Sequence, residues 1–164
     1  MSIESLFPYL LMIGVLSLVV GPIMWMQPSP RQKELVQMRM DARAQGLSPQ
    51  IVPRPEQITQ IESDTVAKYS YYLRENKRTI VRTKQIFTPR YNDAGLITGW
   101  RDEKEHLVTG ELAEVMAKLP QSSYLLELVG NSASLYWKEA GGVDQLKIIS
   151  GTFLQLLSWY KNNA

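Results

Sequence analysis

The single histidine of the chain lies in the run Asp102-Glu103-Lys104-Glu105-His106, where carboxylates and an imidazole come together. Such groups could supply a general base, or hold a divalent metal ion if they converged on one point. Neighbouring residues of a loop rarely converge, and no second histidine is present to complete a set of ligands. We therefore interpret residues 102–106 as a charged, solvated loop, and we expect no metal site and no catalytic residue.

The sequence also lacks the residues that other well-known catalytic and metal-binding sites require. The chain contains no cysteine, which excludes disulfide scaffolds, thiolate zinc sites, iron–sulfur ligation and cysteine nucleophiles. Its glycines form neither a GxGxxG nor a GxxxxGK phosphate loop, and its serines lack a Gly-x-Ser-x-Gly elbow. We therefore expect a protein that is not an enzyme, with no cofactor and no small-molecule substrate.

Basic side chains are concentrated in residues 66–91, which hold seven bases and one acid. They form the predicted basic surface: Lys68, Arg74, Lys77, Arg78, Arg82, Lys84 and Arg90. Anionic lipid, nucleic acid or an acidic protein face could bind such a surface. A membrane tether favours lipid. Nucleic acid is disfavoured, because the interleaved aromatic residues are explained more simply as the core face of a strand than as a stacking platform.

The formal net charge of +2 hides this uneven distribution. Residues 31–54 hold five bases and two acids, whereas residues 92–118 hold six acids and three bases. The composition, 45% hydrophobic with a mean hydropathy of −0.18, excludes both a polytopic membrane protein and a disordered chain. A length of 164 residues suffices for one membrane segment and one domain of ordinary size.

The segment from Ser5 to Pro30 contains no charged residue. Its apolar part, Leu6 to Met26, would reach about 31 Å as a helix, which matches the hydrocarbon core of a bilayer. A cleaved signal peptide would have a basic start and a small-residue exit, and neither is present. We expect an uncleaved transmembrane helix over residues 6–27, preceded by a short outer tail of residues 1–5. The alternative is a buried hairpin or a core helix of a soluble protein.

The charges that flank this segment predict its orientation. Glu4 alone precedes it, whereas Arg31, Lys33, Arg39 and Arg43 follow it. Cytoplasmic flanks of membrane helices are enriched in basic residues. The chain is therefore expected in a bacterial inner membrane, with its N-terminus outside and its C-terminal domain in the cytoplasm.

Small residues recur within the apolar segment. Gly14, Ser17 and Gly21 are spaced so that a helix would place them on one face. Such a face allows another membrane helix to approach closely, which predicts contacts with other inner-membrane subunits. The alternative is the ordinary frequency of glycine and serine in membrane helices.

Local patterns predict the elements that position these residues. Ser29-Pro30-Arg31-Gln32 has the form of a capping box, which predicts a juxtamembrane helix over residues 29–46 that ends at Gly46. Leu47 to Pro53 is interpreted as a short strand, and residues 54–64 as a loop.

Residues 66–74 and 79–88 give the clearest strand signal, because both are rich in β-branched and aromatic residues. The four residues between them suit a hairpin turn, and residues 92–95 suit a second turn into a strand at 96–101. We therefore predict a three-stranded antiparallel meander. Residues 124–129 and 133–139 form a further hairpin candidate.

Two helical patterns follow the meander. One begins after Thr109 and ends at Pro120, and the other covers residues 143–160. The second places one broad apolar face toward the sheet: Leu146, Ile149, Phe153, Leu156, Leu157 and Tyr160. The predicted fold is α+β, with an N-terminal transmembrane helix followed by a small domain, residues 47–164, that has an antiparallel sheet and two or three helices.

The layout of a short tail, one span and the run Gln27-Pro28-Ser29-Pro30-Arg31-Gln32-Lys33-Glu34 resembles small single-pass bacterial inner-membrane accessory proteins of the YajC type. The resemblance covers roughly the first 40 residues, where the basic exit follows the span. It implies a class, a non-enzymatic accessory or assembly subunit of an inner-membrane complex, and it carries over no functional residue. The alternative is a membrane-tethered module that binds anionic lipid or nucleic acid through the basic hairpin.

Overall fold

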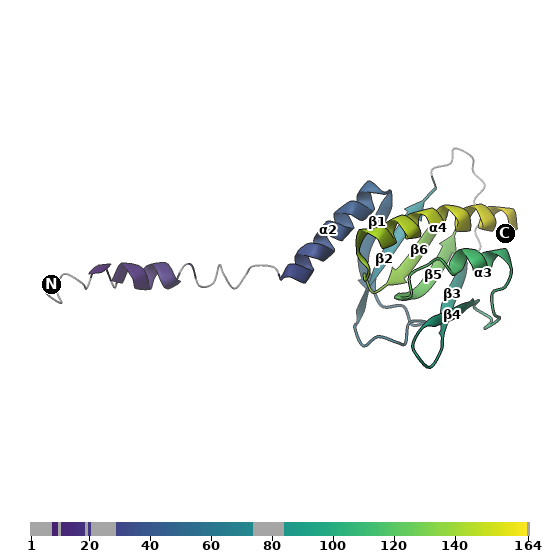
Figure 1. The fold of residues 1–164 in the computed structure, drawn as a ribbon, viewed down its shortest axis with the longest axis horizontal. Coiled ribbons are helices and arrows are strands. Elements are labelled where there is room, and N and C mark those ends of the chain that lie inside the picture. Colours follow the sequence, from purple (N-terminus) through teal and green to yellow (C-terminus); the bar gives the residue numbers. More distant parts are fainter. Residues whose placement is uncertain (1–7, 10, 19, 21–28, 74–83, 164) are drawn as a thin grey trace. The chain divides into compact units, whose positions relative to one another are not determined.

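The computed structural model describes residues 8–9, 11–18, 20, 29–73 and 84–163 (Figure 1). The chain divides into two units, Met1–Val36 and Gln37–Ala164. In the first unit, residues 11–18 are helical and exposed. Within the described residues, no helix combines the length and the apolar character that crossing a bilayer requires.

Helix α2 spans Pro30–Ala44 and begins with the predicted capping box. The backbone N–H of Gln32 donates to Ser29 Oγ (3.3 Å), and the N–H of Ser29 donates to Gln32 Oε1 (2.9 Å). The chain leaves the helix at Gly46, whose φ of +79° lies in the left-handed region that glycine adopts without strain. The predicted helix and its end are therefore confirmed.

Six antiparallel strands form the sheet of the second unit, in the order β1-β2-β6-β5-β3-β4. Their bounds are β1 Leu47–Pro53, β2 Thr65–Tyr72, β3 Lys84–Tyr91, β4 Ile97–Arg101, β5 Ser123–Val129 and β6 Ser132–Trp137. Helices α3, Glu111–Met116, and α4, Gly142–Asn163, follow β4 and β6. The predicted α+β class with an antiparallel sheet is confirmed.

One pairing of the predicted meander is wrong. Strand β2 pairs with β1 and β6, while β3 pairs with β4 and β5, so β2 and β3 are not neighbours. The hairpin of β5 and β6 lies between them because these two strands bury residues on both of their faces, and such strands belong at the centre of a sheet. The hairpins β3–β4 and β5–β6 form as predicted.

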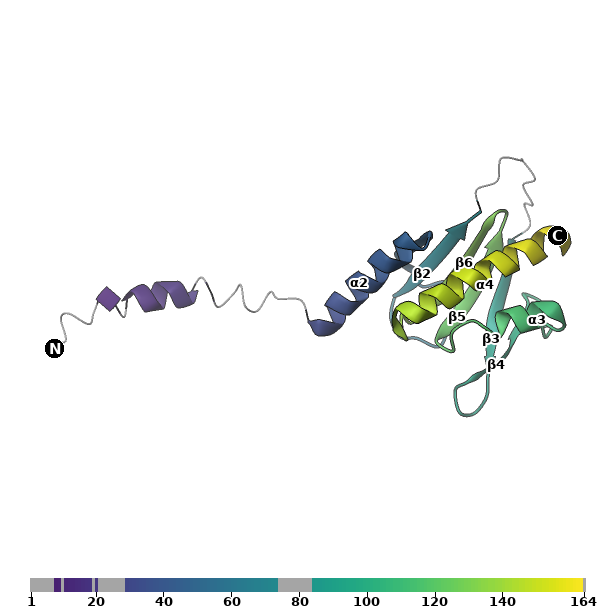
Figure 2. The same cartoon turned by 45° about the horizontal axis from the view of Figure 1, so that its top comes forward.

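Helix α4 crosses one face of the sheet and contacts α3 (Figure 2). All six residues of its predicted inward face are 0% exposed: Leu146, Ile149, Phe153, Leu156, Leu157 and Tyr160. Trp137 of β6 is also buried, and its ring meets that of Tyr69 edge-on at 5.4 Å. The prediction that this helix forms the core is confirmed. We call this side of the sheet the helix face.

The opposite side, which we call the loop face, carries a smaller core. Ile58 of the loop between β1 and β2 packs on Val66, Leu125 and Tyr136. Successive strand residues point to opposite faces, so these three strand residues point away from α4. The loop face therefore has an apolar patch under the loop, next to the polar side chains described below.

Candidate functional site

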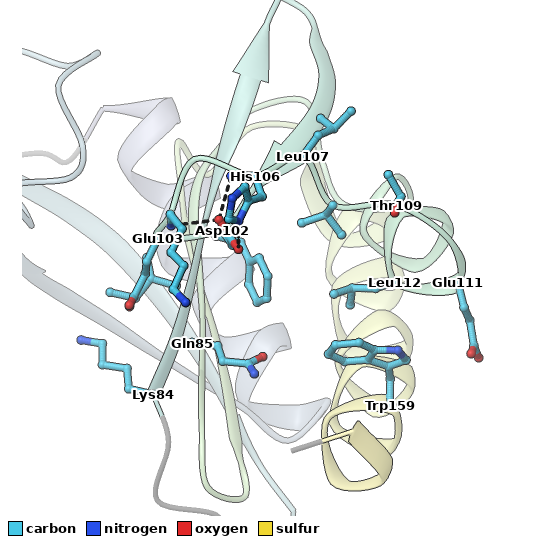
Figure 3. A pocket seen from close by; sticks show the side chains of 14 residues that line it. Lys84, Gln85, Asp102, Glu103, His106, Leu107, Thr109, Glu111, Leu112 and Trp159 are labelled. Carbon is cyan, nitrogen blue, oxygen red and sulfur yellow. Dashed lines mark hydrogen bonds and ion pairs between the residues drawn. The ribbon is translucent and has the colours of Figure 1, made fainter.

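A cavity of about 630 Å³ opens beside β3 (Figure 3). Its walls are residues 84–87 of β3, the turn that follows β4, the start of α3 and Trp159 of α4. Its volume lies within the range of roughly 300–1,000 Å³ that is typical of ligand pockets. The cavity includes His106, and it is therefore the place to test the chemistry considered from the sequence.

The turn after β4 is built around Asp102. Its Oδ1 accepts the backbone N–H groups of His106 (2.8 Å) and Lys104 (2.9 Å), and its Oδ2 lies 3.4 Å from His106 Nδ1. The hydrogen bond from the His106 backbone is the main reason why the pKa of the Asp102 carboxyl lies below its ordinary value. The carboxylate therefore shapes the turn by binding backbone N–H groups.

The other carboxylates of the turn do not gather around His106. Glu105 binds Arg101 at 2.8 Å, and the side chain of His106 is 74% exposed. In the part of the chain that the structure describes, no three histidine, aspartate or glutamate side chains are grouped so that they could hold a metal ion. Residues 103–106 form an exposed turn, as we interpreted them from the sequence.

The inner wall of the cavity is apolar, with one polar exception. Phe87 and Leu112 are buried, and Trp159 is half-buried. Gln85 Oε1 is also buried, and no hydrogen-bond donor from the described residues reaches it. Sequence reasoning did not assign Gln85 or Trp159 to a binding site. The available signals were a polar residue inside a strand pattern and an aromatic residue beside the inward face of α4.

The structure brings two of the predicted basic residues together on a carboxylate. Lys68 Nζ lies 3.0 Å from Glu127 Oε2, Lys84 Nζ lies 2.7 Å from Glu127 Oε1, and the Tyr136 hydroxyl donates to Glu127 Oε2 (3.1 Å). Burial raises the pKa of Glu127, but hydrogen bonds from Lys84 and Lys68 outweigh it, so this pKa lies below its ordinary value. We call these four residues the Glu127 cluster.

The predicted pairing of the two strands that carry Lys68 and Lys84 is therefore wrong, whereas the basic surface itself stays a prediction. The strands that carry them are not paired, and both ammonium groups bind Glu127. Arg90 of β3 is exposed. The remaining predicted bases lie outside the described residues: Arg74, Lys77, Arg78 and Arg82.

A second carboxylate, which the sequence did not single out, lies after β6. Arg39 binds Glu139 through two hydrogen bonds, Nε to Oε1 (2.7 Å) and Nη2 to Oε2 (2.6 Å), and the Tyr69 hydroxyl donates to Oε1 (2.8 Å). Burial and the hydrogen bond to Glu139 raise the pKa of Tyr69 far above its ordinary value. This Glu139 cluster attaches α2 to the sheet from Gln37 onward.

The predicted helix-packing residues fall in the first unit. Gly14 and Ser17 are exposed within helical residues 11–18, whereas Gly21 lies outside the described residues. A Cβ atom added to Gly14 would meet no described atom within 4 Å. Within the described part of the chain, this position therefore has room for a larger side chain.

No model of a known protein family, no curated protein and no solved structure matches this chain. Its function must therefore be inferred from its own residues. Three features serve that purpose: the apolar N-terminal segment, the two carboxylate clusters and the cavity beside β3.

Proposed function

We propose that this chain is a non-enzymatic accessory or assembly subunit of a bacterial inner-membrane protein complex. One transmembrane helix over residues 6–27 anchors it, and its domain lies in the cytoplasm. The observation that carries the proposal is the uncharged segment Ser5–Pro30 with the basic residues that follow it. The resemblance of this region to YajC-type proteins supports the same class.

The packing of α2 supports a close connection between anchor and domain. Met38 is 5% exposed and Ala42 is 0% exposed, and Arg39 between them binds Glu139. The domain therefore begins soon after the apolar run that ends at Met26. Met38 lies 12 residues after Met26 in the sequence, and such a stretch spans at most about 40 Å even when fully extended. An anchored domain would stay near the bilayer surface and meet partners there.

Binding rather than catalysis is supported by how the polar groups of the described residues are used. Asp102 accepts backbone N–H groups, Glu127 and Glu139 bind cations, and His106 is exposed on a turn. General acid–base catalysis needs a base poised beside a reacting group in a protected site. These carboxylates instead stabilise the turn and the sheet.

Topology is the first test of the proposal. A reporter that is fluorescent only in the cytoplasm, fused after Ala164, should be fluorescent in cells, because the basic residues after the span keep this side inside. An enzyme that is active only outside the membrane, fused at the same point, should be inactive. Activity of the outside reporter would overturn the proposed orientation.

Co-purification tests the complex itself. Full-length protein isolated in a mild detergent should carry other membrane subunits, which mass spectrometry would identify. Gly14→Leu and Gly21→Leu should reduce their recovery, because bulky side chains keep a partner helix away. Val19→Leu is the matched control and should retain them. Equal recovery from all variants would mean that the small residues are incidental, and isolation of the protein alone would overturn the assigned function.

The alternative, binding of anionic lipid or nucleic acid through the basic surface, gains no support from the described residues. Lys68 and Lys84 are two of its seven predicted bases, and both are bound to Glu127. An ammonium group that is already paired contributes less to attraction of a second anion. We therefore favour a protein partner.

A further inference from the structure

Residues 84–87 of β3 form a strand edge with one free side. They pair with β5, from Lys84 opposite Val129 to Phe87 opposite Leu126. On the other side, β4 pairs only with the later residues of β3, beginning at Thr88. Within the described residues, no strand continues β4 alongside residues 84–87.

The turn at residues 102–106 explains why β4 does not cover this side of residues 84–87. The chain leaves the line of β4 after Arg101 and returns along the far side of β4. There Leu107 bridges to Arg101, and the N–H of Val108 donates to the carbonyl of Trp100 (2.8 Å). The returning segment therefore extends the sheet next to β4 and does not pair with β3.

The cavity runs along this free edge. Residues 84–87 are consecutive, and all four line the cavity. Because successive side chains of a strand point to opposite faces, four consecutive lining residues indicate that the backbone edge itself borders the cavity. Unpaired N–H and C=O groups of such an edge are a template for pairing with another extended chain.

The opposite edge of the sheet is protected in a way that this one is not. Strand β1 contains Pro49 and Pro53, which lack an N–H and lie four residues apart, so both face the same side of the strand. Proline at an edge prevents strand addition. Residues 84–87 contain no proline. The edge at β3 is therefore able to accept a strand.

The side chains beside this edge indicate which side chains a partner strand paired with residues 84–87 would carry. Figure 3 shows Gln85 pointing from β3 toward Leu112 and Trp159. Gln85 Oε1 is buried without a donor from the described residues, so an incoming N–H group would relieve an unfavourable state. Leu112 and the half-buried Trp159 offer contact to an apolar side chain.

The charge at the rim of the cavity favours a basic ligand. Among the described lining residues, three acids, Asp102, Glu103 and Glu111, outnumber two bases, Lys84 and Lys104, and Lys84 is in addition bound to Glu127. Complementary charge steers a partner to its site and excludes partners of like charge. An extended segment with basic residues between apolar ones fits both the rim and the inner wall.

We propose that this cavity binds an extended basic segment of a protein partner, which adds a strand to residues 84–87 antiparallel to β3. The backbone pairing supplies affinity, and the side chains at Trp159 and at the acidic rim supply selectivity. This inference rests on the proposed function and deepens it, because it names the surface with which the accessory subunit would bind its partner.

A fluorescent octapeptide in which valine alternates with lysine is a suitable probe. Full-length protein in a nonionic detergent at low salt should bind it saturably, as followed by fluorescence anisotropy. The same peptide with alternate backbone nitrogens methylated should not bind, because it cannot complete the hydrogen-bond ladder. A peptide with glutamate in place of lysine should also fail.

Variants of the protein test the two kinds of side-chain contact. Reversing the rim charge with Glu103→Lys and Glu111→Lys together should weaken peptide binding about tenfold. Glu62→Lys, an exposed change elsewhere in the domain, is the matched control and should bind like the wild type. Gln85→Met should weaken binding without lowering the melting temperature, because it removes a buried acceptor that lacks a donor in the free protein.

The outcomes separate this inference from the proposed function. Absence of peptide binding, or equal binding of the methylated and unmodified peptides, overturns the strand-addition site even if membrane subunits co-purify with the protein. Peptide binding that depends on the rim and on Gln85 supports the site. If that binding is found while no membrane subunit co-purifies, the site stands and the membrane-complex function does not.

Discussion

Two carboxylates, Glu139 at the helix face and Glu127 on the loop face, are bound in similar ways but connect different parts of the molecule. Each carboxylate accepts a hydrogen bond from a tyrosine hydroxyl, and each forms an ion pair with at least one basic side chain. Glu139 binds the planar guanidinium of Arg39, which comes from α2, a hundred residues earlier in the chain. Glu127 binds two lysines from other strands of the same sheet. The first cluster attaches a helix, and the second ties strands together.

The partners of the two carboxylates also differ in how easily they can leave. The two hydrogen bonds fix the Arg39 side chain, which is 31% exposed beside a Glu139 side chain that is 7% exposed. The Lys84 side chain is 53% exposed, so its flexible stem can carry the ammonium into water. The same change in charge should therefore cost more at Glu139 than at Glu127.

The largest effect on stability should come from the apolar core of the helix face. Phe153→Ala and Leu156→Ala each remove a side chain that is 0% exposed, which should cost about 3–5 and 2–5 kcal/mol respectively. Denaturant unfolding of the full-length protein in detergent would measure these losses. Leu154→Ala on the same helix is the control and should have little effect, because this side chain is 46% exposed. Equal losses at Leu154 and Phe153 would mean that the opposite face of α4 also packs against something.

The helix face was also the part that the sequence predicted best. The spacing of apolar residues in α4 is a local property, and it identified six of the seven buried positions from Leu146 to Tyr160; the seventh is the polar Thr152. The capping box at Ser29 and the turns of the β3–β4 and β5–β6 hairpins were recognised for the same reason. A pattern within one element shows which side is apolar whatever the element packs against.

The loop face shows what such patterns cannot predict. Lys68 and Lys84 looked like the two arms of one hairpin, but they meet on Glu127 because the strand order places β6 and β5 between β2 and β3. Strand propensity identifies strands, whereas pairing depends on contacts between distant segments. The Glu139 cluster and the cavity beside β3 depend on tertiary packing in the same way, so neither could be predicted.

Glu139→Gln should have the next largest effect. It keeps the shape of the side chain but leaves the Arg39 guanidinium without its counter-charge, which should cost about 1–3 kcal/mol because Arg39 keeps some access to water. Hydrogen exchange should also become faster in α2 beyond Gln37 than in α4. Glu105→Gln, in the exposed pair with Arg101, is the control, and its cost should stay below about 1 kcal/mol. A cost at Glu139 no larger than this would contradict its role in holding α2.

Glu127→Gln should cost less and should show a characteristic pH dependence. The pKa of Glu127 is lower in the folded protein than in the unfolded chain, so the unfolded chain binds the proton more readily in acid. The stabilisation is therefore complete above the unfolded pKa, about 4.3, and is lost as the pH falls through the lower folded pKa. The difference in melting temperature between wild type and Glu127→Gln should thus shrink on acidification from pH 7. A difference that grows in acid would contradict the assigned direction.

The smallest losses of stability should come from removing the two tyrosine hydroxyls. The loss at Tyr69, which binds Glu139, should exceed the loss at Tyr136, which binds Glu127, just as the loss at Glu139 should exceed the loss at Glu127. Tyr69→Phe removes a hydrogen bond at a ring that is 0% exposed, and should cost about 1 kcal/mol. Tyr136→Phe should cost about half as much, because Glu127 keeps both lysines and the Tyr136 hydroxyl lies 3.1 Å away.

Alkaline titration distinguishes Tyr69 from an exposed tyrosine. Its pKa is raised in the folded protein, so the folded state keeps the phenolic proton that the unfolded chain loses above its ordinary pKa of about 10. The contribution of Tyr69 to stability is therefore complete below that pH and declines as the pH rises toward the folded pKa. Tyr69→Phe cannot ionise, so its deficit relative to wild type should narrow above pH 10. A deficit that stays constant through this range would mean that Glu139 and burial do not hold the Tyr69 proton.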